Sequence, residues 1–227
     1  MKRAWISLTV LLMAFCTMAK AEVPEGKKVT GGVGINATAL RFANNLDFVG
    51  SKFGFGAEVN GFLNIPVSKH FAFQFGLTWG FNQAHITNAM TGTRNHSVLK
   101  TMDVEVPMYF MLCLPTRQNG NFFIGAGPYT DFVVKAKMID DGGTESNPYE
   151  LEVGSDPVTG TPTFALNKNN SGLGAMVGYE TPFGLRISGG FSMSISDILG
   201  FKYEGHYVRQ QKITLGVAYH FGRAKAK

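Results

Sequence analysis

Residues 71–82 alternate between bulky apolar side chains and small or polar ones. One set comprises Phe71, Phe73, Phe75, Leu77, Trp79 and Phe81, and the other comprises Ala72, Gln74, Gly76, Thr78, Gly80 and Asn82. A period of two predicts a β-strand, because successive side chains on a strand point to opposite faces. The second face is small, polar and uncharged, which is typical of the inward face of a membrane β-barrel.

The same alternation recurs in eight segments: 28–40, 53–65, 71–83, 98–112, 121–135, 171–181, 184–196 and 208–222. Each reaches the roughly 9 to 11 residues that a tilted strand needs to cross a bilayer. The connections alternate in length, short at 66–70, 115–120 and 181–184, longer at 41–52, 84–97, 136–170 and 197–207. Short periplasmic turns and longer extracellular loops give this pattern. The sequence predicts an all-β fold, an eight-stranded antiparallel up-and-down transmembrane β-barrel with both termini periplasmic.

The rival fold is a soluble barrel or sandwich in which the apolar faces form the core. Alternation alone does not say which face lies inside. A soluble barrel carries Lys, Glu and Asp on its outer surface, whereas here the polar face consists mostly of Gly, Asn, Thr and Ser. We therefore favour the membrane barrel, with lipid as its partner and aromatic girdles at the two interfaces. The girdle residues are Phe71, Trp79, Phe81, Phe110, Tyr219 and Phe221.

The first 21 residues have the features of a signal peptide. A positive start at Lys2 and Arg3 precedes an apolar run, and Ala19-Lys20-Ala21 is a small-x-small cleavage site. The expected organisation is a signal peptide over 1–21, a barrel domain over 22–222 and a short basic tail over 223–227. Removing the signal lowers the formal net charge from +5 to +2, since it carries three basic residues. No basic stripe remains that would indicate nucleic-acid binding.

Three short motifs resemble the PorT-like outer-membrane β-barrel family of Bacteroidetes. They are Val104-Glu105-Val106-Pro107-Met108, Gly125-Ala126-Gly127-Pro128-Tyr129 and the closing Ala218-Tyr219-His220-Phe221. The resemblance covers nearly the whole processed chain and implies an eight-stranded outer-membrane barrel, whereas family members differ in function. The chain departs from the usual pattern by continuing six residues past Phe221. Because proline lacks a ladder donor, we expect β-bulges at Pro107 and Pro128.

Charged residues fall at inward positions of the predicted strands. They are Glu58, Asp103, Glu105, Asp131, Glu180, Arg186, Lys212 and His220. The interior of an eight-stranded barrel is just wide enough to be filled by side chains. We therefore interpret this set as a polar network that fills the lumen, in preference to an ion or proton path, because an unpaired buried charge costs several kcal/mol.

The longest connection, 136–170, is the predicted interaction surface. It carries six carboxylates: Asp140, Asp141, Glu145, Glu150, Glu152 and Asp156. Long loops on a rigid scaffold commonly bind partners. We expect this loop to contact a protein or a surface polysaccharide, the alternative being a solvated loop that shields the barrel mouth. The spacing of an EF-hand is absent, so we predict no metal there.

No catalytic or cofactor site is predicted. His96 and Ser97 are the nearest candidates for a base and a nucleophile, but neighbouring strand residues point to opposite faces and no acid partner or nucleophile elbow accompanies them. Only Cys113 remains after processing, so no intrachain disulfide or Cys-based metal site forms. We expect a non-enzymatic outer-membrane protein with a structural or interaction role, such as a subunit of an export or envelope-assembly machine. The alternatives are a small porin and a lipid-modifying hydrolase.

Overall fold

The computed structural model describes residues 28–45, 49–68, 70–88, 95–140, 149–151, 166–198 and 207–222. These contain nine strands: β1 (Thr30–Asn44), β2 (Val49–Pro66), β3 (Phe71–Asn88), β4 (Asn95–Pro115), β5 (Asn121–Asp140), β6 (Tyr149–Leu151), β7 (Asn169–Glu180), β8 (Leu185–Ser194) and β9 (Val208–Phe221). In this part of the chain, no helix has the length and apolar character needed to span a membrane. The predicted signal peptide and the basic tail lie outside the described residues.

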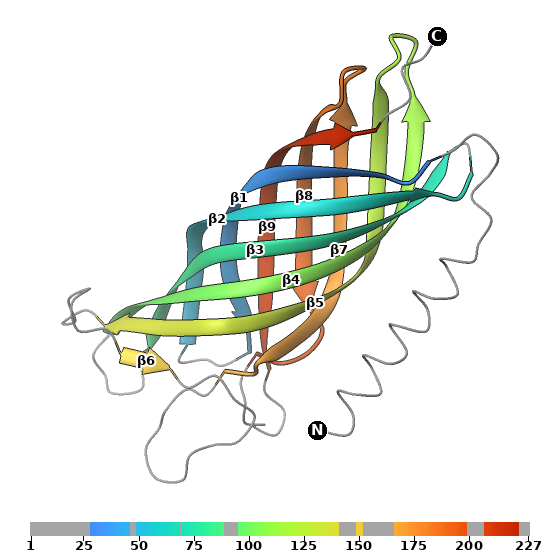
Figure 1. Ribbon diagram of the computed structural model, residues 1–227. Coiled ribbons are helices and arrows are strands. Elements are labelled where there is room, and N and C mark those ends of the chain that lie inside the picture. Colours follow the sequence, from blue (N-terminus) through green and yellow to red (C-terminus); the bar gives the residue numbers. More distant parts are fainter. Residues whose placement is uncertain are drawn as a thin grey trace.

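Eight of the strands close into an antiparallel barrel (Figure 1). Sequence neighbours pair with each other, β1 pairs with β9, and the pairing of β4 with β5 completes the circle. The short β6 is an addition to β5, pairing with Ala136–Met138 beyond the point where the β5–β7 ladder ends at Phe132. The eight-stranded antiparallel barrel expected from the sequence is therefore confirmed.

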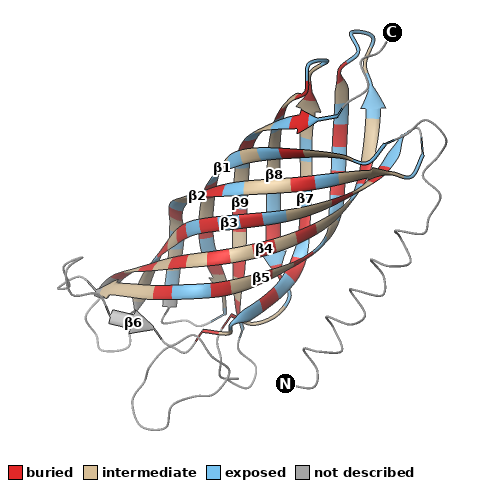
Figure 2. Ribbon diagram, in the orientation of Figure 1, coloured by how far each residue is buried: buried red, intermediate tan, exposed pale blue. Residues whose placement is uncertain are grey.

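Burial alternates along the strands and identifies the inner face (Figure 2). The apolar set faces outward: Phe55, Phe81 and Leu215 are 74%, 61% and 67% exposed. The polar set faces inward, where Glu58 and Lys212 are each 2% exposed. An exposed apolar belt around a buried polar interior is the arrangement of a membrane barrel. The soluble alternative, with an apolar core inside the sheet, is therefore wrong.

β1 to β5 are longer than the alternation predicted, mainly at the loop end, whereas β8 and β9 are shorter. β2 to β5 contain 18 to 21 residues, about 60 to 70 Å of strand. With the usual tilt of about 40° they still rise about 45 Å, more than the roughly 30 Å hydrocarbon core of a bilayer. Most of the predicted loop 41–52 is in fact strand, because β1 ends at Asn44 and β2 begins at Val49. The strict alternation of short and long connections is wrong at that position.

The bulges predicted at Pro107 and Pro128 are absent. The β3–β4 and β4–β5 ladders keep one register on both sides of Pro107, and Pro128 lies within an unshifted β5–β7 ladder. Pro107 is accommodated because Gly76 lies across from it: a Cβ on Gly76 would stand 2.7 Å from the proline Cγ. The register shifts lie instead between Phe53 and Ala57 and between Met102 and Asp103.

The three short turns join strands at one end of the barrel. The first and last residues of the wall, Thr30 and Phe221, lie at the same end. Val67 N–H donates to the Phe71 carbonyl at 2.9 Å, and Thr116 N–H donates to the Gly120 carbonyl at 2.9 Å. In the third turn Gly184 has a φ of +92°, a backbone conformation that favours glycine. We call this the turn end and the opposite one the loop end.

Candidate functional site

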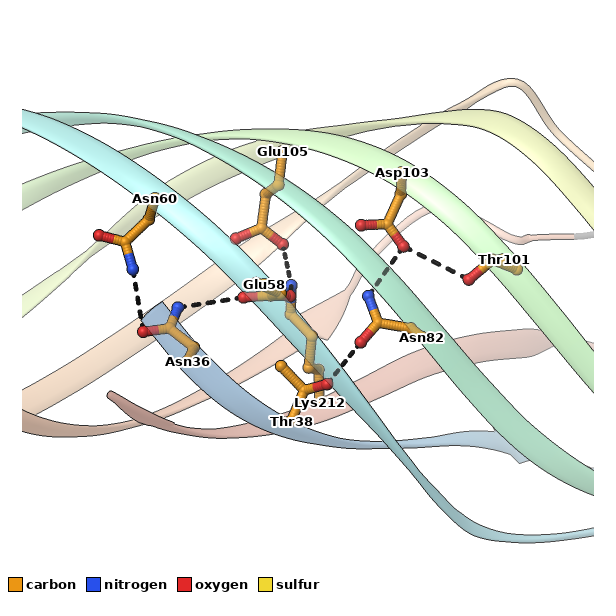
Figure 3. Close-up of polar contacts among 9 residues, drawn as sticks. All are labelled: Asn36, Thr38, Glu58, Asn60, Asn82, Thr101, Asp103, Glu105 and Lys212. Carbon is orange, nitrogen blue, oxygen red and sulfur yellow. Dashed lines mark hydrogen bonds and ion pairs between the residues drawn. The ribbon is translucent and has the colours of Figure 1, made fainter. Parts of the chain in front are cut away.

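The centre of the barrel interior is organised around Lys212 of β9 (Figure 3). Its Nζ lies 2.7 Å from Oε1 of Glu58 on β2 and 2.8 Å from Oε2 of Glu105 on β4, so the ion pairs reach across the lumen. Asn36 donates from Nδ2 to Oε2 of Glu58 at 3.1 Å, and Asn60 donates to Asn36 at 2.9 Å. All three charged side chains are buried, and their contacts join three separate strands.

A second set of contacts lies beside the first. Thr38 donates its hydroxyl to Oδ1 of Asn82 at 2.5 Å, and Asn82 donates from Nδ2 to Oδ2 of Asp103 at 2.9 Å. The Thr101 hydroxyl donates to the same carboxylate oxygen at 3.3 Å. Asp103 is thus held by neutral hydrogen-bond donors from β3 and β4.

Asp131 differs from the other inward carboxylates. It is 1% exposed, and neither carboxylate oxygen accepts a hydrogen bond from the described residues. Its ladder partner Asn170 is fully buried, and its amide atoms are also unbonded within that part of the chain. Among the described residues, Asp131 therefore lacks the hydrogen-bond partner expected for an inward charge. Counting the described residues, the central lumen contains one ammonium and four carboxylates, the latter being Glu58, Asp103, Glu105 and Asp131.

The turn end of the interior holds the other three predicted charges. Arg186 donates from Nη1 to Oε1 of Gln74 at 2.7 Å, and its guanidinium carbon lies 3.7 Å from the centroid of the Phe123 ring. His220 approaches Glu180 at 2.9 Å through Nδ1 and the Thr30 hydroxyl at 2.7 Å through Nε2. The eight predicted lumen residues are all buried, five in the central lumen and three at the turn end.

The loop end of the interior is closed by an apolar group that the sequence interpretation missed. We call it the mouth cluster: Leu40, Phe42, Ala84, Leu99, Val133, Ala136, Leu166, Ile198 and Val208, all buried. Seven members come from the barrel wall, while Leu166 and Ile198 lie in the connections flanking β7 and β8. Leu40 and Phe42 continue the inward parity of Thr38, and that signal was available once the strand was known to extend to Asn44. Apolar packing therefore closes the lumen between the charged centre and the loop end.

The described part of the barrel encloses a central cavity and one at the turn end. The central one, of about 80 Å³, is lined by residues including Glu58, Glu105 and Lys212. The second, of about 420 Å³, lies at the turn end against Phe123 and His220. Arg186 lines both. A polar cavity of the smaller size accommodates a few water molecules.

The six carboxylates of the predicted interaction loop are only partly placed. Asp140 ends β5 opposite Ser97, and Glu150 lies in β6 opposite Lys137. The side chains of these two residues lie outside the described part of the chain, as do the whole of Asp141, Glu145, Glu152 and Asp156.

Of the two residues considered for catalysis, only Ser97 has a described side chain. Ser97 faces the interior and is 7% exposed, while the side chain of His96 lies outside the described residues. Within the described ranges no three His, Cys, Asp or Glu side chains gather in a way that suits a metal ion.

The six predicted girdle aromatics all lie on the outer surface. Each is at least 40% exposed. Three contacts join them in pairs: Phe71 with Phe110 at 5.4 Å between ring centroids, Tyr219 with Phe221 at 5.2 Å, and Trp79 with Phe81 at 6.3 Å. Phe71, Phe110, Tyr219 and Phe221 belong to the turn end, and the Trp79–Phe81 pair lies further along β3 towards the loop end.

Solved barrels resemble the chain at low sequence identity. Neisserial surface protein A shares 13% identity over 85% of this chain and 99% of its own, with a TM-score of 0.46. Ail of Yersinia pestis shares 12% identity over 86% and 100%, with a TM-score of 0.41. The N-terminal β-barrel domain of OprF from Pseudomonas aeruginosa shares 12% identity over 86% and 100%, with a TM-score of 0.33. A search of curated proteins found no match.

Most of the sequence also matches one protein family. The family described as "Outer membrane protein beta-barrel domain" aligns with residues 7–221, which is most of the chain. This match agrees with the closed eight-stranded wall and the exposed apolar belt. The chain belongs to the outer-membrane β-barrel domain family, and it is a protein of the outer membrane.

Proposed function

We propose that this protein is a non-enzymatic and non-conducting outer-membrane scaffold whose loop end binds a partner. The observation that carries the proposal is the filled interior: the mouth cluster caps the lumen, and the Lys212 ion pairs cross its centre. A conducting barrel needs a continuous polar path, whereas an eight-stranded wall leaves room only for side chains. The inward charges then serve to hold the wall together.

The loop end is the proposed binding surface because the barrel wall extends well beyond the apolar belt at that end. β4 and β5 continue well past the apolar belt, and β6 widens the sheet at that end. Such a rigid extension presents the 136–170 connection away from the membrane, where a protein or a surface polysaccharide is accessible. In this orientation the loops face the cell exterior and both termini face the periplasm.

The resemblance to PorT-like barrels supports a narrower version of the proposal, in which the partner belongs to an export or envelope-assembly machine. The residues that carry this resemblance lie in the wall, including Val104–Met108 and Gly125–Tyr129. These residues determine how the barrel packs and do not identify a partner. The partner must therefore be found by experiment.

Conductance tests the closed lumen. We expect the purified full-length protein in planar bilayers to give no current steps, and Glu105→Ala to lower the unfolding temperature without opening a channel. Reproducible steps from the unaltered protein would favour the porin alternative and refute the proposal.

Affinity purification tests the binding role. An affinity tag inserted in the exposed turn at Arg117–Asn119 leaves both the loops and the terminal strand free. We expect a stoichiometric partner to co-purify from gently solubilised outer membranes, and to be lost when residues 152–165 are replaced by a short Gly/Ser linker. A partner that is retained in this variant would show that the 136–170 connection is not the binding surface.

We also propose that residues 1–21 are removed on export and that 22–222 form the folded domain. Intact mass measurement of the protein from outer membranes tests this directly. A mass that includes residues 1–21 would contradict it.

A further inference from the structure

Charge is separated across the barrel wall. Among strand residues whose side chains the structure describes, every carboxylate faces the interior, at Glu58, Asp103, Glu105, Asp131 and Glu180. The outward positions carry basic side chains instead. We call these the basic band: Arg41, Lys52, His85, Lys100, Lys135, Lys137 and Arg209.

The outward direction of the band follows from its neighbours. Arg41 lies between the buried Leu40 and Phe42, and Lys135 and Lys137 flank the buried Ala136. Strand pairing brings members of the band side by side, since Lys52 lies opposite His85 and Lys100 lies opposite Lys137.

Aromatic contacts and one hydrogen bond fix the two arginines on the outer surface. The Arg41 guanidinium lies 4.8 Å from the Phe53 ring centroid, and its Nε donates to Oε1 of Gln211 at 2.8 Å. The Arg209 guanidinium lies 4.7 Å from the Tyr207 ring centroid. These contacts leave the planar groups at the surface with donors available for an anion.

The band occupies one end of the apolar belt. On β3, His85 is the second outward position past the exposed Phe81, and on β9, Arg209 is the second outward position beyond Ile213. The opposite end has a different chemistry. Its outward wall positions are aromatic or aliphatic, including Phe71, Phe110 and Phe221. Among the described strand residues, outward basic side chains therefore occur at the loop end alone.

We propose that the basic band binds the phosphate groups of lipids in the leaflet that surrounds the loop end. Positions just beyond the apolar belt lie at the depth of lipid headgroups, and clustered Lys and Arg side chains attract anionic lipid there. Arginine and lysine are also the usual phosphate ligands. A surface that merely faces water carries both signs interspersed, whereas the described outward side chains of β1 to β5 and β9 carry only positive charge at this end. On the added strand β6, Glu150 lies opposite Lys137.

This inference goes beyond the proposed function, because it assigns a ligand to the outer wall rather than a partner to the loops. It also has its own test: lipid binding by the purified barrel depends neither on conductance nor on capture of a protein partner.

The test uses the folded full-length protein in a neutral detergent, with bisphosphorylated lipid A as the probe and native mass spectrometry as the readout. The band variant is Lys52→Gln/Lys135→Gln, in which both lysines are exposed. The matched control is Lys28→Gln/Arg117→Gln, which removes the same charge from exposed positions at the turn end. Heat-modifiable gel mobility reports whether each variant is folded.

We expect the band variant to bind the probe about tenfold more weakly and the control to bind as the unaltered protein does. The unaltered protein should also lose affinity as salt is raised, and should bind dephosphorylated lipid A poorly. These two measurements need no variant, so they test the proposal even if a substitution prevents folding. Equal affinity for the dephosphorylated lipid would overturn the proposal, and so would equal weakening in band and control variants. Displacement by inorganic phosphate at matched phosphate concentration would overturn the assignment to lipid.

Discussion

Lys212→Met is the sharpest perturbation of the barrel interior. Methionine retains most of the aliphatic stem, so the change removes the ammonium with little loss of packing. Glu58 and Glu105, which are 2% and 5% exposed, then lose the ion pairs at 2.7 and 2.8 Å. Removing one member of a buried ion pair costs about 3 to 5 kcal/mol, because the remaining charge stays desolvated without compensation. Two such carboxylates depend on Lys212, so we expect the free energy of unfolding to fall by at least about 3 kcal/mol.

Urea titration of the protein refolded into lipid vesicles measures this change. Trp79 is 55% exposed on the outer wall, so its fluorescence reports the transfer from lipid to water on unfolding. The control is the triple variant Glu58→Gln/Glu105→Gln/Lys212→Met, which removes the two carboxylates together with the ammonium. We expect it to recover most of the lost stability, since replacing a whole buried ion pair is often nearly neutral. Lys212→Met within about 1 kcal/mol of the unaltered protein would refute the reasoning, as would a triple variant no more stable than the single one.

Three further substitutions test individual parts of the interior. Asp131→Asn removes a buried carboxylate that has no hydrogen-bond partner among the described residues, and we expect an increase of about 1 to 3 kcal/mol in the same titration; a decrease would show that the charge has a partner in solution. Gly127→Ala should destabilise the barrel, because the added Cβ would overlap the Met108 carbonyl oxygen. At Gly61 the nearest atom to an added Cβ is 3.9 Å away, so the matched Gly61→Ala should be close to neutral. Equal effects of the two substitutions would contradict the close approach of Gly127 to Met108. Leu40→Ala, at a residue 1% exposed in the mouth cluster, should lower the free energy of unfolding by about 2 to 5 kcal/mol. The variant should still give no current in planar bilayers, and current steps would show that the cluster seals the lumen less firmly than proposed.

Much of the wall could be predicted from local pattern. A strand that separates lipid from a packed lumen has a strict period of two, so the parity of Glu58 and Lys212 was evident once each strand was recognised. The strand ends were harder to predict. Past the membrane the outer face no longer needs to be apolar, and the alternation that marks a strand weakens at Arg41 and Lys52. The segment that contains them was therefore assigned to a loop.

The contacts inside the lumen could not be predicted in the same way. Parity says that Asp131 and Lys212 both face inward, but not that Lys212 pairs with Glu58 and Glu105 while Asp131 has no hydrogen-bond partner in the described part. Those distances depend on the stagger of strands far apart in the sequence and on the bulges near Phe53 and Met102. The bulges were predicted at Pro107 and Pro128 because proline lacks a ladder donor. The space that Gly76 on the neighbouring strand leaves for Pro107 was not considered.

The sequence by itself determined that this protein is a membrane barrel, because the hydrophobic effect imposes the same alternation on every strand that separates lipid from a polar lumen. The choice of interior contacts was left to the tertiary structure. Closure of β1 on β9 and of β4 on β5 sets which side chains meet, and only then do Leu166 and Ile198 pack into the mouth cluster and the basic residues of six strands form one band. The physical reason is that the face on which a side chain lies depends on its own strand alone. Which side chains contact each other inside the lumen depends on how all the strands of the closed barrel are paired.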